Sequence, residues 1–585
     1  MLIAGSAASF PAGAGPSDVA DAVMKRDKVA LRALLRHKAD VRTSQADGAT
    51  ALHWAVYHDD LEVADLLIRA GANVKAANRT GITPLAMASL YGNAPMIDTL
   101  LRAGADAKER GPNGETTLMY AARNGSPAAI RALLAAGADV NAAEGVRGTT
   151  ALMWAAEQRH PSATKALIEG GADVGARSGP AGRPRNYMAD RVLAGNVEAA
   201  QKRRLAAAAA GRTYQEQLEF ERSIGVKTGG RGVNPTTGPR TSAGAKPLVD
   251  QVDADNNVVV AGLVGSGGGG LTALVFAARE GDAESARLLI EGGAAVNQPT
   301  EYGWTPLLTA ANNRHYKLAV QLIGLGANVN LANKGGWTPL YLATDNRNIE
   351  GGDYPVPRAD MDHLEFIKIL LERGANPNVR VRDDTLSRTI FTMQWFFESG
   401  ATPFVRAAQS SDMELMKLLL KYGADPTITT DYGDTALTVA SGIGWVEGVT
   451  YERSAKENLE VVGWLLGLGL DPNAANHDGR TALMGAALKG RSGVVQLLVD
   501  RGARLETYDK GSRDTDTVVS VLAGHTWQAV DYADGLVRTG VQSAIPRPET
   551  ASLIRKLMAE RGLQVPPPNR TIESICVVPI CQGQR

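Results

Sequence analysis

Apolar and polar residues alternate along this chain in short blocks whose period fits pairs of short α-helices. In residues 61–70, for example, Val63, Leu66 and Leu67 recur at helical spacing and form one apolar stripe. Gly71 follows directly, and glycine commonly ends a helix because it adopts the left-handed backbone conformation without strain. The pattern therefore predicts a helix over 61–70 that stops at this glycine.

A start signal precedes another, shorter helix in the same block. Thr50, Thr83 and Thr305 each follow a turn that contains glycine, and Ala or Pro and then Leu come after them. The threonine hydroxyl caps a helix N-terminus, and proline suits the first helical turn because its φ angle is already fixed. Each block is thus predicted to hold two helices, with a turn before the first.

The block recurs at a fixed interval. A Gly-Ala pair, usually followed by Asp, Asn or Ala, marks the end of the copies at Gly71, Gly104, Gly137, Gly171, Gly293, Gly326, Gly374, Gly423 and Gly502, with variants at Lys38 and Gly469. Neighbouring markers lie 33 or 34 residues apart from Lys38 to Gly171, and three later intervals lengthen to between 46 and 49 residues. A period of this length indicates a stacked repeat protein, whose units bury their apolar faces against one another.

The repeated motif resembles the ankyrin repeat, of the bacterial, multi-repeat type with long insertions. Thr50-Ala51-Leu52-His53-Trp54-Ala55 matches the Thr-Pro-Leu-His-x-Ala signature with one substitution, and about eleven copies cover most of the chain. The resemblance implies an all-α repeat solenoid of helix-turn-helix units with β-hairpin-like loops, interrupted by one long insert. It also implies a concave side, where the hairpin tips and first helices of this family usually bind partners.

The repeats predict six segments. They are a leader or residual signal segment (1–16), a first block of about five ankyrin repeats (17–177), a basic, partly helical and partly disordered insert (178–270), a second block of about six repeats (271–510), a degenerate C-terminal capping repeat (511–565) and a tail (566–585). The second block carries loop insertions at 345–362, 381–399 and 441–457.

Composition and motifs indicate a binding protein rather than an enzyme. The chain has 62 Lys and Arg against 62 Asp and Glu, so no overall charge favours nucleic acid or an anionic membrane as partner. No apolar run approaches the length of a membrane span. The eight His show no paired metal spacing, and no known catalytic motif occurs. We therefore expect a non-catalytic, monomeric protein with no cofactor, no bound metal and no small-molecule substrate.

The insert departs from this charge balance. Residues 177–246 hold thirteen Lys and Arg against five Asp and Glu, and Lys202, Arg203 and Arg204 form the densest point. The segment could be an arm that binds anions or nucleic acid, or a solvated excursion whose charge keeps it soluble. No aromatic residues interleave with the basic cluster, which disfavours nucleic acid because base stacking needs aromatic rings.

Large side chains recur at two positions of the repeat where this family contacts partners. Trp304 and Trp337 stand one period apart in the turn before the capping threonine, and the first helices carry Trp54, Met87, Tyr120, Trp154 and Phe276 at corresponding places. Aromatic rings on a rigid lattice are typical interface anchors, although the same residues could pack between helices. We expect a scaffold that binds an unidentified protein through its concave face and hairpin tips. The alternatives are binding through the basic insert and a regulatory subunit of a neighbouring enzyme.

The two ends of the chain suggest export. The first fifteen residues are small and mostly apolar, which is typical of the end of a secretory signal. Cys576 and Cys581 are spaced to close a small disulfide loop, and disulfides form outside the cytosol. A reduced thiol pair and a cytoplasmic N-terminus remain the alternative, so the expected location is periplasmic or secreted, with cytoplasmic as the second choice.

Overall fold

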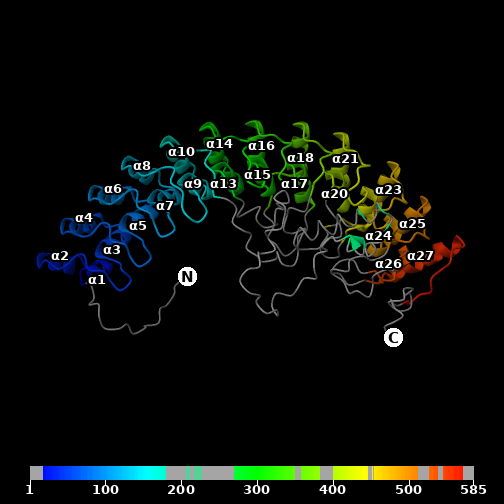
Figure 1. Cartoon of the computed structure of the whole chain (residues 1–585), viewed down its shortest axis with the longest axis horizontal. Helices are drawn as coiled ribbons and strands as arrows, with labels where there is room; N and C mark the ends of the chain where they lie inside the picture. Colours follow the sequence, from blue (N-terminus) through cyan, green and yellow to red (C-terminus); the bar gives the residue numbers. More distant parts are fainter. Residues whose placement is uncertain are drawn as a thin grey trace. The chain divides into compact units, whose positions relative to one another are not determined.

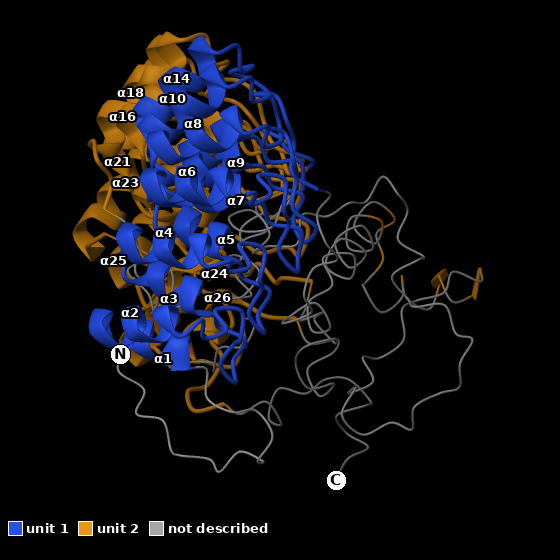
Figure 2. Ribbon diagram, turned by 90° about the vertical axis from the view of Figure 1, so that its left-hand side faces the viewer, with its two compact units in different colours: residues 1–181, 269–301 blue, residues 182–268, 302–585 orange. Residues whose placement is uncertain are grey.

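The computed structural model describes residues 18–179, 269–348, 358–382, 399–445, 451, 453–510, 526–537 and 545–570, with a few positions between 206 and 224. The chain divides into two compact units, residues 1–181 with 269–301 (unit 1) and residues 182–268 with 302–585 (unit 2) (Figure 2). Both units consist of paired α-helices, and no β-sheet forms within the described ranges. The predicted all-helical repeat fold is thus confirmed.

Unit 1 stacks its helix pairs in two rows, which can be followed in Figure 1. The first helices are α1 (Asp18–Met24), α3 (Ala51–Tyr57), α5 (Pro84–Leu90), α7 (Thr117–Asn124), α9 (Ala151–Glu157) and α13 (Ala273–Glu280). The second helices are α2 (Lys28–Arg36), α4 (Leu61–Arg69), α6 (Ala94–Arg102), α8 (Pro127–Ala135), α10 (Pro161–Glu169) and α14 (Ala283–Glu291). Each first helix packs against the first helix of the next pair.

Unit 2 repeats this arrangement. Its first helices are α15 (Pro306–Asn312), α17 (Pro339–Arg347), α20 (Pro403–Gln409), α22 (Ala436–Ser441), α24 (Ala482–Lys489) and α26 (Ala529–Ala533). Its second helices are α16 (Tyr316–Gly324), α18 (His363–Glu372), α21 (Met413–Lys421), α23 (Ala455–Gly467), α25 (Ser492–Asp500) and α27 (Pro548–Glu560).

Threonine caps begin most first helices, as the sequence predicts. The Thr83 hydroxyl accepts a hydrogen bond from the Ala86 N–H at 3.0 Å. At Thr50 the signature histidine completes the cap, because the Thr50 N–H donates to His53 Nδ1 at 3.1 Å. With Nδ1 accepting, the ring proton lies on Nε2, which donates to the Ile82 carbonyl of the next repeat at 3.0 Å. The cap therefore also joins two repeats.

Successive turns are joined by backbone hydrogen bonds. The Arg79 N–H donates to the Asp47 carbonyl at 2.9 Å, and Gly145 donates to Asn113 at 2.7 Å. Gly48 allows this approach, because its φ is +84° and a Cβ at that position would lie 2.9 Å from the Arg79 nitrogen. The glycine of the turn thus serves the stacking of repeats as well as the turn itself.

Leucines of both helices form a core that is continuous from repeat to repeat. Leu52 and Leu67 of one repeat and Leu85 and Leu100 of the next have no exposed surface. Complete burial of a leucine side chain stabilises a fold by about 1.5–3 kcal/mol. A single helix pair would leave its apolar face in water, so the stacking of repeats stabilises each of them.

The long insert leaves and re-enters unit 1 at adjacent points. The Ser178 N–H donates to the Leu271 carbonyl at 2.8 Å, and the Gly270 N–H donates to the Gly179 carbonyl at 3.2 Å. Beyond it, α13 packs on α9 and α14 packs on α10, so this pair continues the stack of unit 1. The compact unit therefore ends at Glu301, one repeat beyond the expected division between the two blocks.

Several predicted segments lie outside the described residues. They are the leader at 1–16, nearly all of the insert, the central parts of the three loop insertions, and the end of the tail from residue 571. The predictions for these segments stay predictions. The region expected to form a capping repeat contains α26 and α27 in its described parts.

Candidate functional site

Large side chains, most of them aromatic, line the first-helix face of unit 1. Trp54, Met87, Tyr120 and Trp154 occupy the same position on α3, α5, α7 and α9, and each is partly exposed. The two indole N–H groups are engaged within the protein, since Trp54 donates to Gln45 Oε1 at 2.7 Å and Trp154 donates to the Thr149 hydroxyl at 2.8 Å. The rings are therefore held in place while part of each faces solvent.

Neighbouring residues that the sequence reasoning missed enlarge this surface. Tyr57, Leu90 and Tyr91 are 55 %, 41 % and 48 % exposed. Tyr57 packs edge-on against Trp54 with the ring centroids 5.6 Å apart, and it meets Tyr91 of the next repeat at 6.3 Å. Tyr57 and Leu90 each stand three residues after a predicted residue on the same helix, a spacing that could have revealed them. We name the set Trp54, Tyr57, Met87, Leu90, Tyr91, Tyr120 and Trp154 the aromatic stripe.

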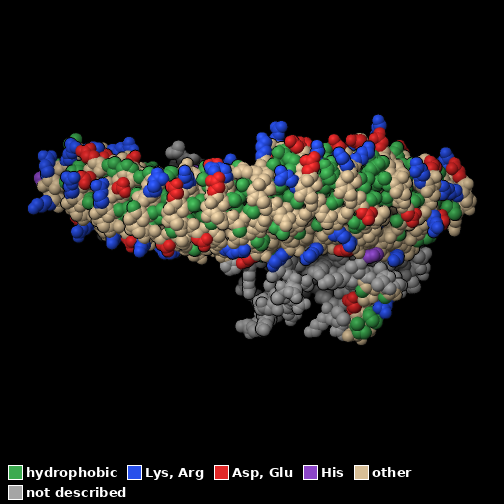
Figure 3. Space-filling model, turned by 90° about the horizontal axis from the view of Figure 1, so that it is seen from above, with side chains coloured by type: hydrophobic (Ala, Val, Ile, Leu, Met, Phe, Trp, Pro, Cys, Tyr) green, Lys and Arg blue, Asp and Glu red, His purple; other side chains and the backbone are tan. Residues whose placement is uncertain are grey.

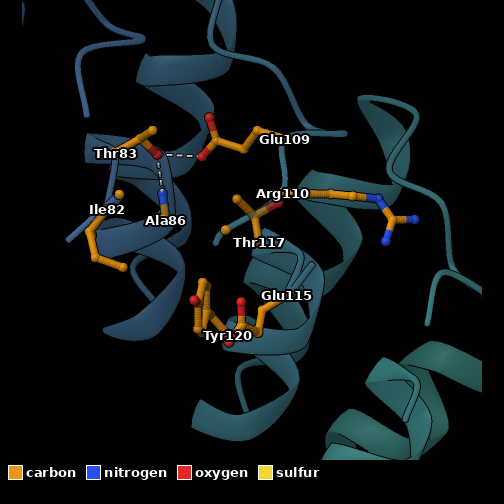
Figure 4. Close-up of a pocket in the computed structure, with 10 residues that line it drawn as sticks. Ile82, Thr83, Ala86, Glu109, Arg110, Glu115, Thr117 and Tyr120 are labelled. Carbon is orange, nitrogen blue, oxygen red and sulfur yellow. Dashed lines mark hydrogen bonds between the residues drawn. The ribbon is translucent and has the colours of Figure 1, made fainter. Parts of the chain in front are cut away.

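A small pocket opens beside the stripe, between the turns that precede α5 and α7 (Figure 4). Its lining residues are Gly81, Ile82, Thr83, Ala86, Glu109, Arg110, Gly111, Glu115, Thr117 and Tyr120. Figure 4 shows the Glu109 carboxylate beside Thr83, whose hydroxyl donates to it. Glu115 and Tyr120 lie together on the α7 side, and the Arg110 side chain extends away from them.

The pocket carries negative charge in a partly buried place. Burial raises the pKa of Glu109, and the hydrogen bond from Thr83 offsets only part of this effect. Burial also acts to raise the pKa of Glu115, but hydrogen bonds from Asn113 outweigh it and lower the pKa. The pKa of Tyr120 is raised by burial and then by the charge of Glu115. The raised pKa values of Glu109 and Tyr120 indicate that negative charge is poorly solvated at these two groups, whereas the lowered pKa of Glu115 shows that its hydrogen bonds stabilise the carboxylate.

Trp304 and Trp337 do not lie at an accessible surface, which corrects the prediction for them. Trp337 has no exposed surface, Trp304 is 3 % exposed, and the Trp337 ring packs edge-on against Tyr341 at 4.9 Å. The same turn position is buried at Ala401 and Trp527, so in unit 2 the residue before the cap points inward. Rings with so little exposed area cannot form a binding surface, and these tryptophans are core residues.

Phe276 is likewise a core residue. It is 3 % exposed, although it continues the series of Trp54, Tyr120 and Trp154 in the sequence. The guanidinium of Arg279 lies over its ring, with the central carbon 4.9 Å from the centroid. The aromatic stripe therefore ends at Trp154, and the expectation that Phe276 belongs to the binding surface is corrected.

Unit 2 buries charge at the position where unit 1 exposes rings. Arg406 on α20 corresponds to Tyr120 on α7, but it is buried. Its Nε donates to Asp345 Oδ1 at 2.8 Å, and its other nitrogens donate to the Asn348 carbonyl and the Ser410 hydroxyl at 3.0 and 3.2 Å. Unit 2 thus has a buried ion pair at this position, whereas the corresponding side chain of unit 1, Tyr120, is partly exposed.

The second helices carry a mixed and exposed charge pattern. Figure 3 shows acidic and basic side chains interspersed along one side of the molecule. Many of these charges pair within one helix, as Arg287 does with Glu284 at 2.6 Å and with Glu291 at 2.5 Å. Exposed pairs of this kind contribute between 0 and about 1 kcal/mol each. Among the described second helices, no cluster of charges of one sign indicates a binding site.

The remaining predicted site residues, Lys202, Arg203 and Arg204 of the insert and the pair Cys576 and Cys581, lie outside the described residues. Over the described ranges, no three His, Cys, Asp or Glu side chains gather as metal ligands would. Over the same ranges, no helix combines the length and the apolar character that crossing a membrane requires.

Comparison with known proteins matches both units to one family. Models of ankyrin repeats in three copies match residues 20–110, 85–178, 245–333 and 274–381. Models of ankyrin repeats in many copies match residues 404–451 and 452–499.

Three curated relatives share part of the chain. The human SH3 and multiple ankyrin repeat domains protein 2 is 27 % identical over 30 % of this chain and 10 % of its own length. The mouse ankyrin repeat and SOCS box protein 16 is 33 % identical over 18 % and 22 %. Palmitoyltransferase AKR1 of Lachancea kluyveri is 30 % identical over 26 % and 19 %. The chain spans less than a quarter of each relative, and because ankyrin models match more than half of its residues, it belongs to the ankyrin repeat family.

Proposed function

We propose that the protein is a non-catalytic scaffold that binds a protein partner on the aromatic stripe of unit 1. The observation that carries this proposal is the contrast between aligned, partly exposed large side chains, three of them aromatic, on α3, α5, α7 and α9 and the buried residues at the same positions of α17, α20 and α22. Protein interfaces are enriched in Tyr, Trp and Met, and their hot spots are enriched in Tyr and Trp, because these side chains bury a large area at low entropic cost. Isolated exposed rings would need no such explanation, but a row of them does.

The family supports the same function. Ankyrin repeats are typically modules for protein–protein interaction and usually have no catalytic role. One relative is named a palmitoyltransferase, but the shared region is only 19 % of that protein. We extend the absence of catalysis to this chain as part of the proposal, and its test is turnover by the purified protein.

A double variant tests the stripe. Trp54→Ala with Tyr120→Ala removes two fixed rings that lie two repeats apart, and partners are captured on the full chain and identified by mass spectrometry. We expect the variant to lose one or more proteins that the wild type retains, with thermal unfolding unchanged within a few degrees. Val29→Ala, at an exposed apolar residue on α2, is the matched control and should retain them. An identical set of proteins on all three chains would refute the proposal.

The basic insert is a second candidate for binding. The hydrogen bonds between Ser178 and Leu271 close its base, so the insert leaves unit 1 as one excursion. Replacing residues 181–267 by a short glycine linker should therefore leave unit 1 folded. If the insert binds anions, affinity for heparin should fall steeply with salt and be lost in the deletion.

We also propose a bacterial-type protein that is exported to the periplasm or secreted. The small apolar leader and the spacing of Cys576 and Cys581 support this location. Cell fractionation together with thiol alkylation of the intact chain tests both features. A cytosolic protein with two free thiols would contradict the proposal.

A further inference from the structure

We propose that the partner which lies along the aromatic stripe presents a cationic side chain, arginine or lysine, to the pocket formed by Glu109, Glu115 and Tyr120. This inference rests on the proposed function and specifies the chemistry of the bound segment. The aromatic stripe is uncharged and does not favour either sign of charge on the partner. The acidic pocket beside it therefore determines which charge the partner carries there.

The geometry places two carboxylates and one ring around a single opening. Gly111 lies beside Glu115 and Tyr120, because a Cβ at this residue would be 3.0 Å from Glu115 Oε2 and 3.3 Å from the Tyr120 hydroxyl. The Glu109 carboxylate faces the opening from the α5 side, where Thr83 holds it (Figure 4). The space inside the pocket is about 10 Å³, enough for about one water molecule, so a cationic group of the partner would lie at its mouth.

Within the described residues, both carboxylates bond only to neutral groups. The partners of Glu109 are the Thr83 hydroxyl and the Ala86 backbone, and those of Glu115 include Asn113. Arg110, the basic residue of the lining, is already engaged, since its Nη1 donates to the Gly114 and Ala143 carbonyls at 3.3 and 3.0 Å. The pocket thus has negative charge that no cation of unit 1 pairs with at hydrogen-bond distance.

Charge complementarity selects the occupant. The partly buried Glu109 carboxylate feels the charge of Lys75 but has no cation of the described residues at hydrogen-bond distance, and a guanidinium or ammonium group of the partner would supply that contact. The Tyr120 ring beside the carboxylates adds a surface on which a cation is also stabilised. A phosphate or a carboxylate of the partner would be repelled at the same place. The fit is therefore to a basic residue within an apolar segment.

Peptide selection on the full chain tests this inference. A phage library of random dodecapeptides is selected on the wild type, and the enriched sequences are compared with the unselected library. One selected peptide and its Gln-substituted form are then measured by fluorescence anisotropy against the wild type and three variants. The variants are Glu109→Gln with Glu115→Gln, Trp54→Ala with Tyr120→Ala, and Glu169→Gln, an exposed glutamate on α10, as the control.

We expect Lys or Arg to be enriched at one position. The Glu109 and Glu115 variant should weaken the basic peptide about tenfold and leave its Gln-substituted form unchanged, while Glu169→Gln should alter neither. Peptides without basic residues that still depend on Trp54 and Tyr120 would overturn the inference and leave the proposed function standing. Basic peptides that bind the Glu109 and Glu115 variant as tightly as the wild type would overturn it as well. Binders that ignore Trp54 and Tyr120, or a library without binders, would contradict the proposed function itself.

Discussion

Arg347 and Asp412 form an ion pair inside unit 2, with 2.7 Å between Arg347 Nε and Asp412 Oδ2. Asp412 has no exposed surface, and it also caps α21 and receives Arg453 Nη2 at 3.0 Å. Arg347 is the last residue of α17 and Arg453 lies just before α23, so the two arginines come from the helix pairs on either side of the α20–α21 pair. The Asp412 carboxylate therefore links three successive helix pairs.

Removal of this carboxylate should destabilise unit 2 strongly. Asp412→Ala leaves two arginines close together without their shared partner, and breaking a buried ion pair costs about 3–5 kcal/mol. Asp282→Ala in unit 1 is the control, because Asp282 caps α14 through Ser285 in the same way but forms no ion pair with a described residue. Loss of that cap alone should cost about 1 kcal/mol. Urea unfolding measures both, and equal costs would contradict a role of the ion pair.

The buried and the exposed tryptophans should respond oppositely to truncation. Trp337→Ala creates a cavity in a packed core, for which a cost of about 3–5 kcal/mol is usual. Trp54→Ala removes a ring that is partly in solvent already, and we expect a loss of no more than about 1 kcal/mol. Thermal unfolding of the two single variants distinguishes them. A Trp337→Ala protein as stable as the wild type would show that this ring is accessible after all.

The fold was predictable from sequence because its signals are local and repeated. Thr83 caps a helix through its own neighbours, and Gly71 ends one through its own backbone, so each feature needs no knowledge of distant residues. The period then places Trp54, Tyr120 and Trp154 on equivalent faces. Whether a side chain on such a face is exposed or buried depends on the residues that pack against it. The sequence of one repeat does not show which residues these are.

Burial is where sequence reasoning failed, and the reason is physical. Trp304 and Trp337 occupy the turn position of Glu115 and Thr149, but this position is enclosed by packing in unit 2, whereas Glu115 stays partly exposed beside the pocket. Asp412 is in sequence an ordinary helix cap, and only the folded chain brings Arg347, 65 residues away, to it. Glu109 was missed because a single glutamate in a predicted turn does not indicate a pocket. The pocket forms only when the neighbouring turn packs beside it in the folded chain.

Asp434 should make unit 2 less stable as the pH rises. Burial raises the pKa of its carboxyl to about 6, and a hydrogen bond from Asn476 at 2.8 Å limits the increase. An unfolded aspartate has a pKa of about 3.9, so the folded state holds the proton more tightly. The contribution of Asp434 to the free energy of unfolding is therefore highest below about pH 4 and is lost as the pH rises through 6, by up to about 3 kcal/mol in total.

Asp434→Asn tests this dependence. The neutral side chain should raise the thermal midpoint of unit 2 above pH 6 and have no such effect below about pH 4. Asp425→Asn is the control, because hydrogen bonds from Thr427 lower the pKa of this exposed carboxylate and give the opposite sign. Parallel stability curves for wild type and Asp434→Asn between pH 4 and 7 would contradict the effect.

The stacking of turns in unit 1 should depend on Gly48 more than on Gly71. Both have positive φ, so alanine strains the backbone at either position, at a cost of about 1 kcal/mol for Gly71→Ala. At Gly48 a Cβ would also lie 2.9 Å from the Arg79 nitrogen, whereas at Gly71 the nearest atom is Arg42 Nη2 at 3.8 Å, an ordinary contact distance. Gly48→Ala must therefore separate two turns and lose the bond from Arg79 to Asp47, for a total of about 3 kcal/mol. Equal thermal midpoints of the two variants would mean that these turns do not stack in solution.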